Sequence, residues 1–308
     1  MDTNGHIDRI GIANDSESIT DHGGILRGRL EPYDAPGPRG TGDQTDADAP
    51  ALGYVAAWVG GSHAHGLADA ASDIDLHAVI LPGRSAVLLG EDMGTRAFHE
   101  PDLKITTPLA LMRQLAKGMP NALEWLAVPS DCDLTADGPL RHWARYARAL
   151  TCPATLRAAM GNAGANLRQL DAPSTSWNGR KMRKVQAETM RLLHCVRHAL
   201  DGETWPCRLP SDETLTLREI RREGCDVEAL RREYNDLAHP VDLLGSTDRS
   251  DTIDARRQLR QDLLDLYAGV VTADDGGAGD AQCHMTIQTY SSTDILACLG
   301  TFRQRHAD

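Results

Sequence analysis

The segment GGSHAHGLADAASDIDLHAV at positions 60–79 limits the fold of this chain more than any other part of the sequence. It follows an apolar run, ALGYVAAWV, which stops at Gly60-Gly61 and so predicts a strand that enters a glycine turn. After the turn, DIDLHAVIL alternates in polarity and is bounded by Pro82-Gly83, which predicts a second strand. The sequence therefore predicts two consecutive strands joined by a glycine-rich turn.

The two ends of this segment carry different chemistry. The turn at Gly61 and Ser62 offers backbone N–H groups and a hydroxyl to the oxygen atoms of a phosphate. Asp73 and Asp75 lie two residues apart in an extended strand, so both carboxylates project from the same face. Mg²⁺ prefers one or two carboxylates together with phosphate oxygens and water. The segment therefore predicts a site for a nucleotide with a divalent cation.

The second predicted strand has two different faces. Its apolar face is formed by Ile74, Leu76, Ala78 and Ile80. His77 shares the opposite face with Asp75. Two roles for it stay open and are equally favoured: contact with the substrate and a structural role. From the turn, His63 and His65 are expected to line the substrate pocket together with His77. A histidine metal site is disfavoured, because no third ligand lies at zinc-like spacing.

This arrangement resembles a known signature. Gly61-Ser62, ten further residues and then Asp73-Ile74-Asp75 are similar to the motif of the DNA polymerase β-like nucleotidyltransferase superfamily. The segment GSHAHG followed by SDIDL is especially similar to the corresponding segment of the small, stand-alone bacterial and phage members of this superfamily. The resemblance implies an α+β fold, in which a nucleotidyltransferase-type mixed β-sheet palm with flanking helices is followed by a helical C-terminal region.

The superfamily carries a third carboxylate on a neighbouring strand. We expect FHEPDLKIT to form a third strand, weaker than the first two because Pro101 favours an edge position or a late start. One face of this strand would present Glu100, Asp102 and Lys104. Asp102 is the candidate for the third acid, and Glu100 is the alternative.

The resemblance assigns a role to each of these residues. It implies that Asp73 and Asp75 bind two Mg²⁺ ions, with Mn²⁺ as an alternative ion. It also implies that Asp102 completes the second metal site and helps to deprotonate an acceptor hydroxyl, and that Gly61 and Ser62 hold the triphosphate. The metals then stabilise the attacking and leaving oxygens during in-line displacement at the α-phosphate.

The best helix of the second half is predicted over about 180–200, where apolar residues recur at helical spacing and Gly202 ends the pattern. Lys184, Glu188 and Arg191 share one face of it. By a looser resemblance, Lys184 and Arg191 are expected to contact phosphate. Glu188 stands where those relatives suggest a histidine, so no catalytic role is assigned to it.

Other motifs in this half are interpreted as structural. His194, Cys195 and His198 form an HCxxH pattern within the helix, which indicates packing rather than a metal site. Several arginines are interpreted as a solvated helical face: Arg218, Arg221, Arg222, Arg231 and Arg232.

The chain divides into four predicted regions. Residues 1–50 are polar and poor in aromatic residues, so we expect no folded core there. Residues 51–150 form the predicted catalytic domain, with a loop at 83–97, and residues 151–270 form a helical domain that completes the cleft. Residues 271–308 are expected to be a linker and a C-terminal tail, the linker being ADDGGAGDAQ.

The composition of the chain limits the classes of function that can be expected. A net charge of -12 and only 4% aromatic residues weaken non-specific binding to nucleic acid. Seven cysteines without a CxxC pair indicate reduced thiols, and the absence of a long apolar span in the sequence argues against a membrane protein. We therefore expect a cytoplasmic enzyme.

The expected reaction is transfer of a nucleoside monophosphate from a nucleoside triphosphate, with ATP favoured, to a hydroxyl group with release of pyrophosphate. A small molecule or a protein is the favoured acceptor. The alternatives are a nucleotide-binding, antitoxin-like partner protein, an RNA-end nucleotidyltransferase and, less favoured, a polymerase.

Overall fold

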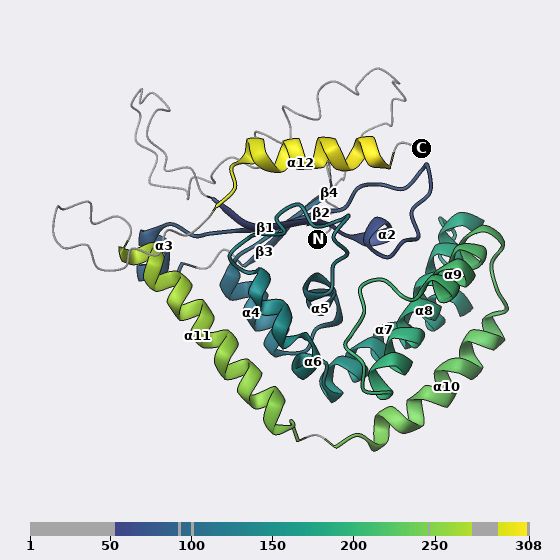
Figure 1. Cartoon of the computed structure of the whole chain (residues 1–308). Coiled ribbons are helices and arrows are strands. Elements are labelled where there is room, and N and C mark those ends of the chain that lie inside the picture. Colours follow the sequence, from purple (N-terminus) through teal and green to yellow (C-terminus); the bar gives the residue numbers. More distant parts are fainter. Residues whose placement is uncertain (1–52, 92–93, 100–101, 246, 273–288, 307–308) are drawn as a thin grey trace, which may run out of the picture.

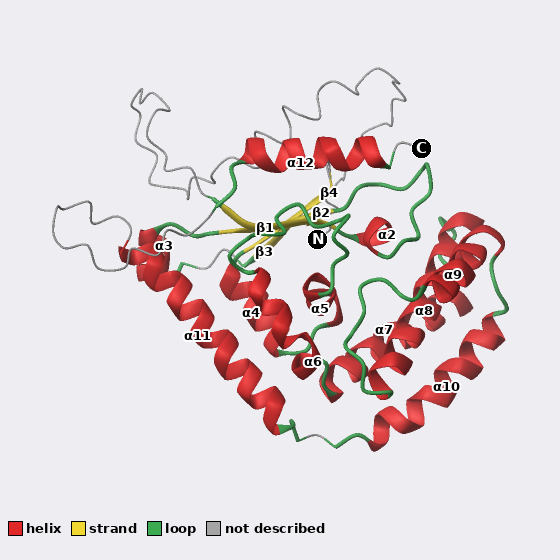
Figure 2. Ribbon diagram, viewed as in Figure 1, coloured by secondary structure: helices red, strands yellow, loops and turns green. Residues whose placement is uncertain are grey.

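The computed structural model describes residues 53–91, 94–99, 102–245, 247–272 and 289–306. Among these residues, strands lie between positions 54 and 106, apart from single bridge residues, and helices form most of the rest (Figure 2). This confirms the α+β class. No helix within these ranges is both long enough and apolar enough to cross a bilayer. The predictions for residues 1–50 and for the linker at 273–282 lie outside the described residues.

A four-stranded mixed sheet forms the centre of the fold. The strands are β1 (Tyr54–Val59), β2 (Leu76–Ile80), β3 (Thr95–His99) and β4 (Asp102–Thr106), in the order β1-β2-β4-β3. β2 runs antiparallel to β1 and parallel to β4, while β3 runs antiparallel to β4. The parallel register pairs Leu76 with Leu103. Asp75 and Asp102, which precede these two residues, therefore lie at the same edge of the sheet.

The stretch between β2 and β4 differs from its prediction. The loop expected at 83–97 instead contains helix α3 (Arg84–Leu89) and most of β3. FHEPDLKIT, expected to be one strand, is divided between β3, which ends at His99, and β4, which begins at Asp102. Proline cannot donate a hydrogen bond to the strand ladder, so Pro101 favours this interruption.

One face of the sheet is covered by helices that follow it in the sequence. They are α4 (Pro108–Ala116), α5 (Pro120–Leu126), the 3-10 helix η1 (Arg141–Tyr146) and α6 (Ala147–Leu150), with α11 (Ser250–Thr272) alongside α4 (Figure 1). α4 begins at Pro108, where proline is well tolerated, and Thr107 caps it by accepting a hydrogen bond from the N–H of Ala110. Trp125 and Trp143 are fully buried beneath the sheet.

The remaining helices pack beside this layer as a separate group. They are α7 (Pro153–Asp171), α8 (Gly179–Leu200), α9 (Ser211–Glu223) and α10 (Val227–Leu243) (Figure 1). α8 confirms the helix predicted at 180–200 and begins after Asn178, which accepts a hydrogen bond from the N–H of Lys181. One apolar core joins Val59 of β1 to Leu193 of α8, so the sheet and the helical group are packed together.

A C-terminal helix covers the opposite face of the sheet, in place of the tail expected beyond residue 271. Helix α12 (Ser292–Arg305) lies across the strands on the side away from α4 and α5 (Figure 1). Ser291 and Asp294 cap its start reciprocally. Its buried side chains include Ile295, Leu299 and Phe302. Just before it, Tyr290 exchanges two backbone hydrogen bonds with Tyr54 of β1, at 2.8 and 2.9 Å.

Candidate functional site

The glycine turn lies directly against the residues that begin β2. Gly60 donates its N–H to the carbonyl oxygen of Asp75 at 2.8 Å. A Cβ atom on Gly60 would lie 2.8 Å from the ring of His77. Gly61 has a φ of +57°, and a Cβ atom there would lie 1.7 Å from Oδ2 of Asp75. Glycine is therefore needed at both positions, for close approach at Gly60 and for approach and conformation at Gly61.

The turn leads into the short helix α2 (Gly61–Ala64) and leaves two donors at its start. Gly60 and Gly61 accept hydrogen bonds from the N–H groups of Ala64 and His65. Within the described ranges, no hydrogen bond uses the N–H of Gly61 or of Ser62. The turn therefore offers two backbone donors, which suits an anionic ligand.

Three carboxylates gather near this turn. Asp73 is exposed, whereas Asp75 and Asp102 are partly buried. Burial raises the pKa of the Asp75 carboxyl, and the negative charges of Asp102 and Asp73 raise it further, against the opposing effect of Lys184. Negative charge is thus concentrated at the sheet edge, which favours a bound cation. Glu100, the alternative third acid, lies outside the described residues.

These carboxylates do not form a closed metal cage. Among the residues that the structure describes, no group of three or more His, Cys, Asp or Glu side chains is arranged to hold a metal ion. Mg²⁺ needs only one or two carboxylates when phosphate and water complete its shell. The hard oxygen donors of Asp75 and Asp102, at one sheet edge, fit that partial requirement, with Asp73 available from the exposed side.

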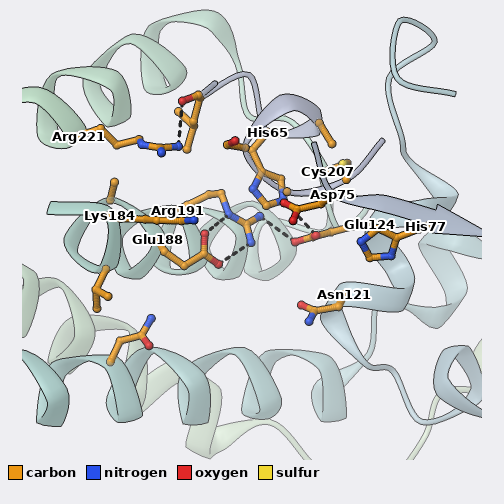
Figure 3. A pocket seen from close by; sticks show the side chains of 18 of the residues that line it. His65, Asp75, His77, Asn121, Glu124, Lys184, Glu188, Arg191, Cys207 and Arg221 are labelled. Atoms are coloured by element: carbon orange, nitrogen blue, oxygen red, sulfur yellow. Dashed lines mark hydrogen bonds and ion pairs between the residues drawn. The ribbon is translucent and has the colours of Figure 1, made fainter. Parts of the chain in front are cut away.

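A pocket of about 360 Å³ opens between the glycine turn, the sheet and α8 (Figure 3). It brings together seven of the predicted site residues: Gly61, Ser62, His65, Asp75, His77, Lys184 and Arg191. Asp73, Asp102 and His63 are outside its wall. Residues from distant parts of the sequence therefore meet in one cavity, with Asp75, which precedes β2, on one side and α8 on the other.

The structure corrects the role expected for Arg191. Its guanidinium is 2% exposed and forms ion pairs of 2.8 Å with Glu124 of α5 and with Glu188 of its own helix (Figure 3). Burial favours the neutral form of both carboxyls, but the charge of Arg191 outweighs it and lowers the pKa of Glu124 to about 2. Arg191 is therefore committed to two carboxylates at the pocket wall, rather than held ready for phosphate.

His65 extends this network. Its Nε2 lies 3.1 Å from Oε2 of Glu124. Because an ionised carboxylate can only accept, His65 donates this hydrogen bond. The residue that follows α2 is thereby connected to α5 and, through Glu124, to Arg191 of α8. Sequence reasoning missed Glu124, since nothing in NALEWLAV distinguishes it from an exposed helical glutamate.

Lys184 is the predicted phosphate contact that agrees best with the geometry. It lines the pocket from α8, and its charge lowers the pKa of Asp75 across the cavity (Figure 3). Within the described ranges, no acidic side chain forms an ion pair with it. Lys104 of β4 and Lys181 of α8 line the same pocket. The cavity therefore contains positive charge near the glycine turn.

His77 lies in the pocket wall and stacks on Trp58, with ring centroids 5.0 Å apart. Burial lowers its pKa to about 4, and the positive charge of Lys104 adds to this effect. His77 is therefore neutral near pH 7. It can offer a hydrogen bond to a ligand, while its low basicity suits it poorly to accept a proton there.

His63 points away from the pocket that it was expected to line. Its ring contacts Phe302 and His306 at the end of α12, with centroid distances of 5.3 and 6.1 Å. Burial lowers its pKa, and the charge of His306 adds to that effect. Helical geometry explains why His63 and His65 point in different directions. Residues two positions apart lie on nearly opposite sides of a helix, and of these two only His65 contacts Glu124.

Three arginines from the helical half hold the loop after the turn. Arg208 donates to the carbonyls of His63 and Ala64 at 3.1 and 3.0 Å. Arg218 donates to Gly66 O at 2.7 Å, and Arg221 donates to Leu67 O at 2.9 Å. Arg218 and Arg221 were interpreted as a solvated helical face, and Arg208 carried no sequence signal. These side chains instead fix the backbone next to the candidate site.

The HCxxH motif on α8 forms a separate polar cluster. Glu213 of α9 accepts hydrogen bonds from His194 at 2.7 Å and from His198 at 3.0 Å. Between them, Cys195 is fully buried, and burial raises its pKa to about 12. The motif joins α8 to α9, and Cys195 also accepts a contact of 3.9 Å from Nη1 of Arg191.

Comparison with known proteins found no match: no family model, no curated protein and no solved structure is similar to this chain at a significant level.

Proposed function

We propose that this protein is a magnesium-dependent nucleotidyltransferase, which moves a nucleoside monophosphate from a nucleoside triphosphate to an acceptor hydroxyl. The observation that carries this proposal is the close packing of the Gly60-Gly61 turn on Asp75. The N–H donors of this turn could bind an anionic phosphate, and the Asp75 carboxylate beside them could bind the divalent cation that accompanies it. The binding sites for the two ions would therefore be adjacent. Asp102, at the same sheet edge, supplies a second carboxylate.

The pocket suggests how the triphosphate is held. The N–H groups of Gly61 and Ser62 donate hydrogen bonds to phosphate oxygens on one side, and Lys184 and Lys181 neutralise the phosphate charge from α8. Arg191 acts indirectly, by holding Glu124 and Glu188 in place. ATP is the favoured nucleotide.

Asp75 and Asp102 would hold Mg²⁺, with Asp73 as a further ligand from the exposed side. A bound divalent cation supplies charge neutralisation and orientation for in-line displacement at the α-phosphorus. The repulsion that raises the pKa of Asp75 supports this assignment, because a bound cation relieves it.

The chemistry requires one nucleophile and one leaving group. The acceptor oxygen forms a bond to the α-phosphorus while the bond from that phosphorus to the bridging oxygen breaks, and pyrophosphate leaves with those electrons. Asp102 accepts the proton of the acceptor hydroxyl. Lys184, which lines the pocket, would stabilise the negative charge that develops on pyrophosphate. A small molecule or a protein is the proposed acceptor.

The decisive experiment uses Mg²⁺ and α-labelled ATP with wild type, Asp75→Asn and the control Asp242→Asn. Asp242 is an exposed residue of α10 outside the pocket. We expect pyrophosphate release and label transfer to a panel of hydroxyl compounds and proteins, lost in Asp75→Asn and retained in Asp242→Asn. Because Asp75→Asn removes electrostatic repulsion, its thermal midpoint should not fall.

Transfer that survives Asp75→Asn would contradict the proposal. If transfer is absent and a partner protein binds wild type and Asp75→Asn equally, the chain is instead a nucleotide-binding, antitoxin-like partner.

A further inference from the structure

A second pocket, of about 320 Å³, lies beside the first and is formed by the loop after α2 and by α9. Its wall includes Leu67, Asp69, Leu215, Arg218, Arg221 and Arg222. Leu67 and Arg221 line both pockets, so the two cavities are neighbours with a shared wall. The proposed nucleotide site makes no use of this second space.

The second pocket is positively charged, in contrast to the chain as a whole, which has a net charge of -12. Arg218, Arg221 and Arg222 are spaced i, i+3 and i+4 on α9, so they share one side of the helix. Of the two acids in the wall, Asp69 is paired with Arg180 of α8 at 3.2 Å. Three guanidinium groups therefore face a single unneutralised carboxylate, that of Glu219.

Two of these guanidinium groups are held in fixed positions. Arg218 uses Nε to bind Gly66 O, and Arg221 uses Nη1 to bind Leu67 O. Each guanidinium has five N–H groups, so most of its donors stay available. Arg222 is 70% exposed, and its one ion pair with a described residue is a long contact of 3.7 Å with Glu223. Ordered guanidinium forks with spare donors are suited to bidentate binding of phosphate.

We propose that this arginine pocket is the acceptor subsite, and that it binds a terminal phosphate monoester on the compound that receives the nucleotide. This inference rests on the proposed function. Leu67 and Arg221 line both pockets, so an acceptor whose phosphate occupies the arginine pocket would extend its hydroxyl into the neighbouring pocket, which Asp75 lines. Leu67 and the exposed Leu215 supply apolar surface beside the phosphate. The phosphate is carried by a small sugar phosphate, in agreement with the small-molecule acceptor proposed above. The 5′ end of an RNA strand presents the same chemical group and is distinguished from it by the test.

The test compares Arg222→Gln with Arg232→Gln in the full-length protein. Arg222 does not hold the loop after α2, so its removal spares the nucleotide site. Arg232 is a matched control, since it is 69% exposed, lies on α10 and has a similarly long contact of 3.6 Å with Asp226. Calorimetric titrations use ribose 5-phosphate against ribose, and a 5′-phosphorylated RNA trinucleotide against its 5′-hydroxyl form. Each is performed with and without saturating α,β-methylene-ATP and Mg²⁺.

We expect at least one phosphorylated probe to bind wild type and Arg232→Gln equally, and to bind Arg222→Gln at least about tenfold more weakly, as for one lost charge-assisted hydrogen bond. The probe that responds identifies the source of the phosphate. The inference is overturned if no probe binds, if the unphosphorylated forms bind equally well, or if both variants behave alike. If only the ATP analogue fails to bind, the proposed function is wrong and the pocket is not an acceptor subsite. The titrations without the analogue then still decide whether the arginine pocket binds a phosphate monoester.

Discussion

Gly61 and Asp75 approach so closely that position 61 accepts no side chain, since a Cβ atom would lie 1.7 Å from Oδ2 of the carboxylate. The contact joins the anion-accepting turn to the carboxylate that precedes β2. It also ties the function of the site to one backbone conformation, because Gly61 has a left-handed φ of +57°.

Replacing Gly61 with alanine should disable the site beyond its effect on stability. The left-handed conformation alone costs roughly 1–2 kcal/mol for alanine. The clash with Asp75 adds a displacement on the order of 1 Å, for which a loss of about 100-fold in transfer rate is expected. The control is Gly90→Ala, where φ is +68° and no atom lies within 4 Å. Equal transfer rates for the two variants would contradict the assigned contact.

Lys184→Met should weaken the binding of α,β-methylene-ATP by about tenfold, because one charge-assisted contact to the triphosphate is lost. Lys117→Met, at an exposed position outside the pocket, should leave the affinity unchanged. Isothermal titration calorimetry in the presence of Mg²⁺ measures both. An unchanged affinity in Lys184→Met would remove this residue from the phosphate site.

Arg191→Met should lower the free energy of unfolding by about 3–5 kcal/mol, since it leaves Glu124 buried without its counter-ion. The control is Arg197→Met on the same helix, where the half-exposed arginine pairs with Glu233. Removing such a surface ion pair should cost about 1 kcal/mol or less. Urea denaturation measures the free energy of unfolding of both variants. Similar decreases would show that the buried ion pairs of Arg191 stabilise the fold no more than a surface ion pair does.

The contribution of Glu124 to the free energy of unfolding should depend on pH. Its pKa falls from the ordinary 4.5 to about 2 in the folded protein, so the unfolded chain takes up the proton first as the pH decreases. The contribution is complete above pH 4.5 and is lost as the pH falls toward 2. The difference in unfolding free energy between wild type and Glu124→Gln should therefore shrink over that interval. A difference that stays constant with pH would show that the carboxylate is not ionised in the fold.

Phe302→Ala should destabilise the fold by about 3–5 kcal/mol, the usual cost of emptying a buried phenylalanine site. Leu243→Ala, at an apolar position that is largely exposed, should change stability by less than about 0.5 kcal/mol. Thermal or urea unfolding distinguishes these outcomes. If Phe302→Ala is as mild as the control, α12 does not cover the sheet as described.

The parts of the site that could be predicted from sequence are those with local signals. The Gly60-Gly61 turn and the alternation in DIDLHAVIL depend on neighbouring residues only, and both strands are present. The second strand begins at Leu76, however, so Asp73 and Asp75 precede it instead of lying within it as predicted. Helical spacing likewise placed Lys184 and Arg191 on one face of α8, and both line the pocket.

The parts that could not be predicted depend on contacts between distant segments. Arg191 looks the same as Lys184 in the sequence, and only the approach of α5 brings Glu124 to it. Arg218 and Arg221 belong to a strongly polar helix, whose pattern does not reveal that two of its side chains hold the loop after α2. The three buried side chains of α12 stand in a short segment among small and polar residues, a weak periodic signal.

Tyr54 pairs with Tyr290, and α12 covers one face of the sheet. Both contacts matter for folding of the nascent chain. As the protein leaves the ribosome, β1 and β2 emerge early, whereas the helix that covers their outer face is synthesised more than two hundred residues later. Until then, that apolar surface stays open to water and to neighbouring nascent chains. Chaperone dependence and aggregation during translation should therefore centre on this face of the sheet.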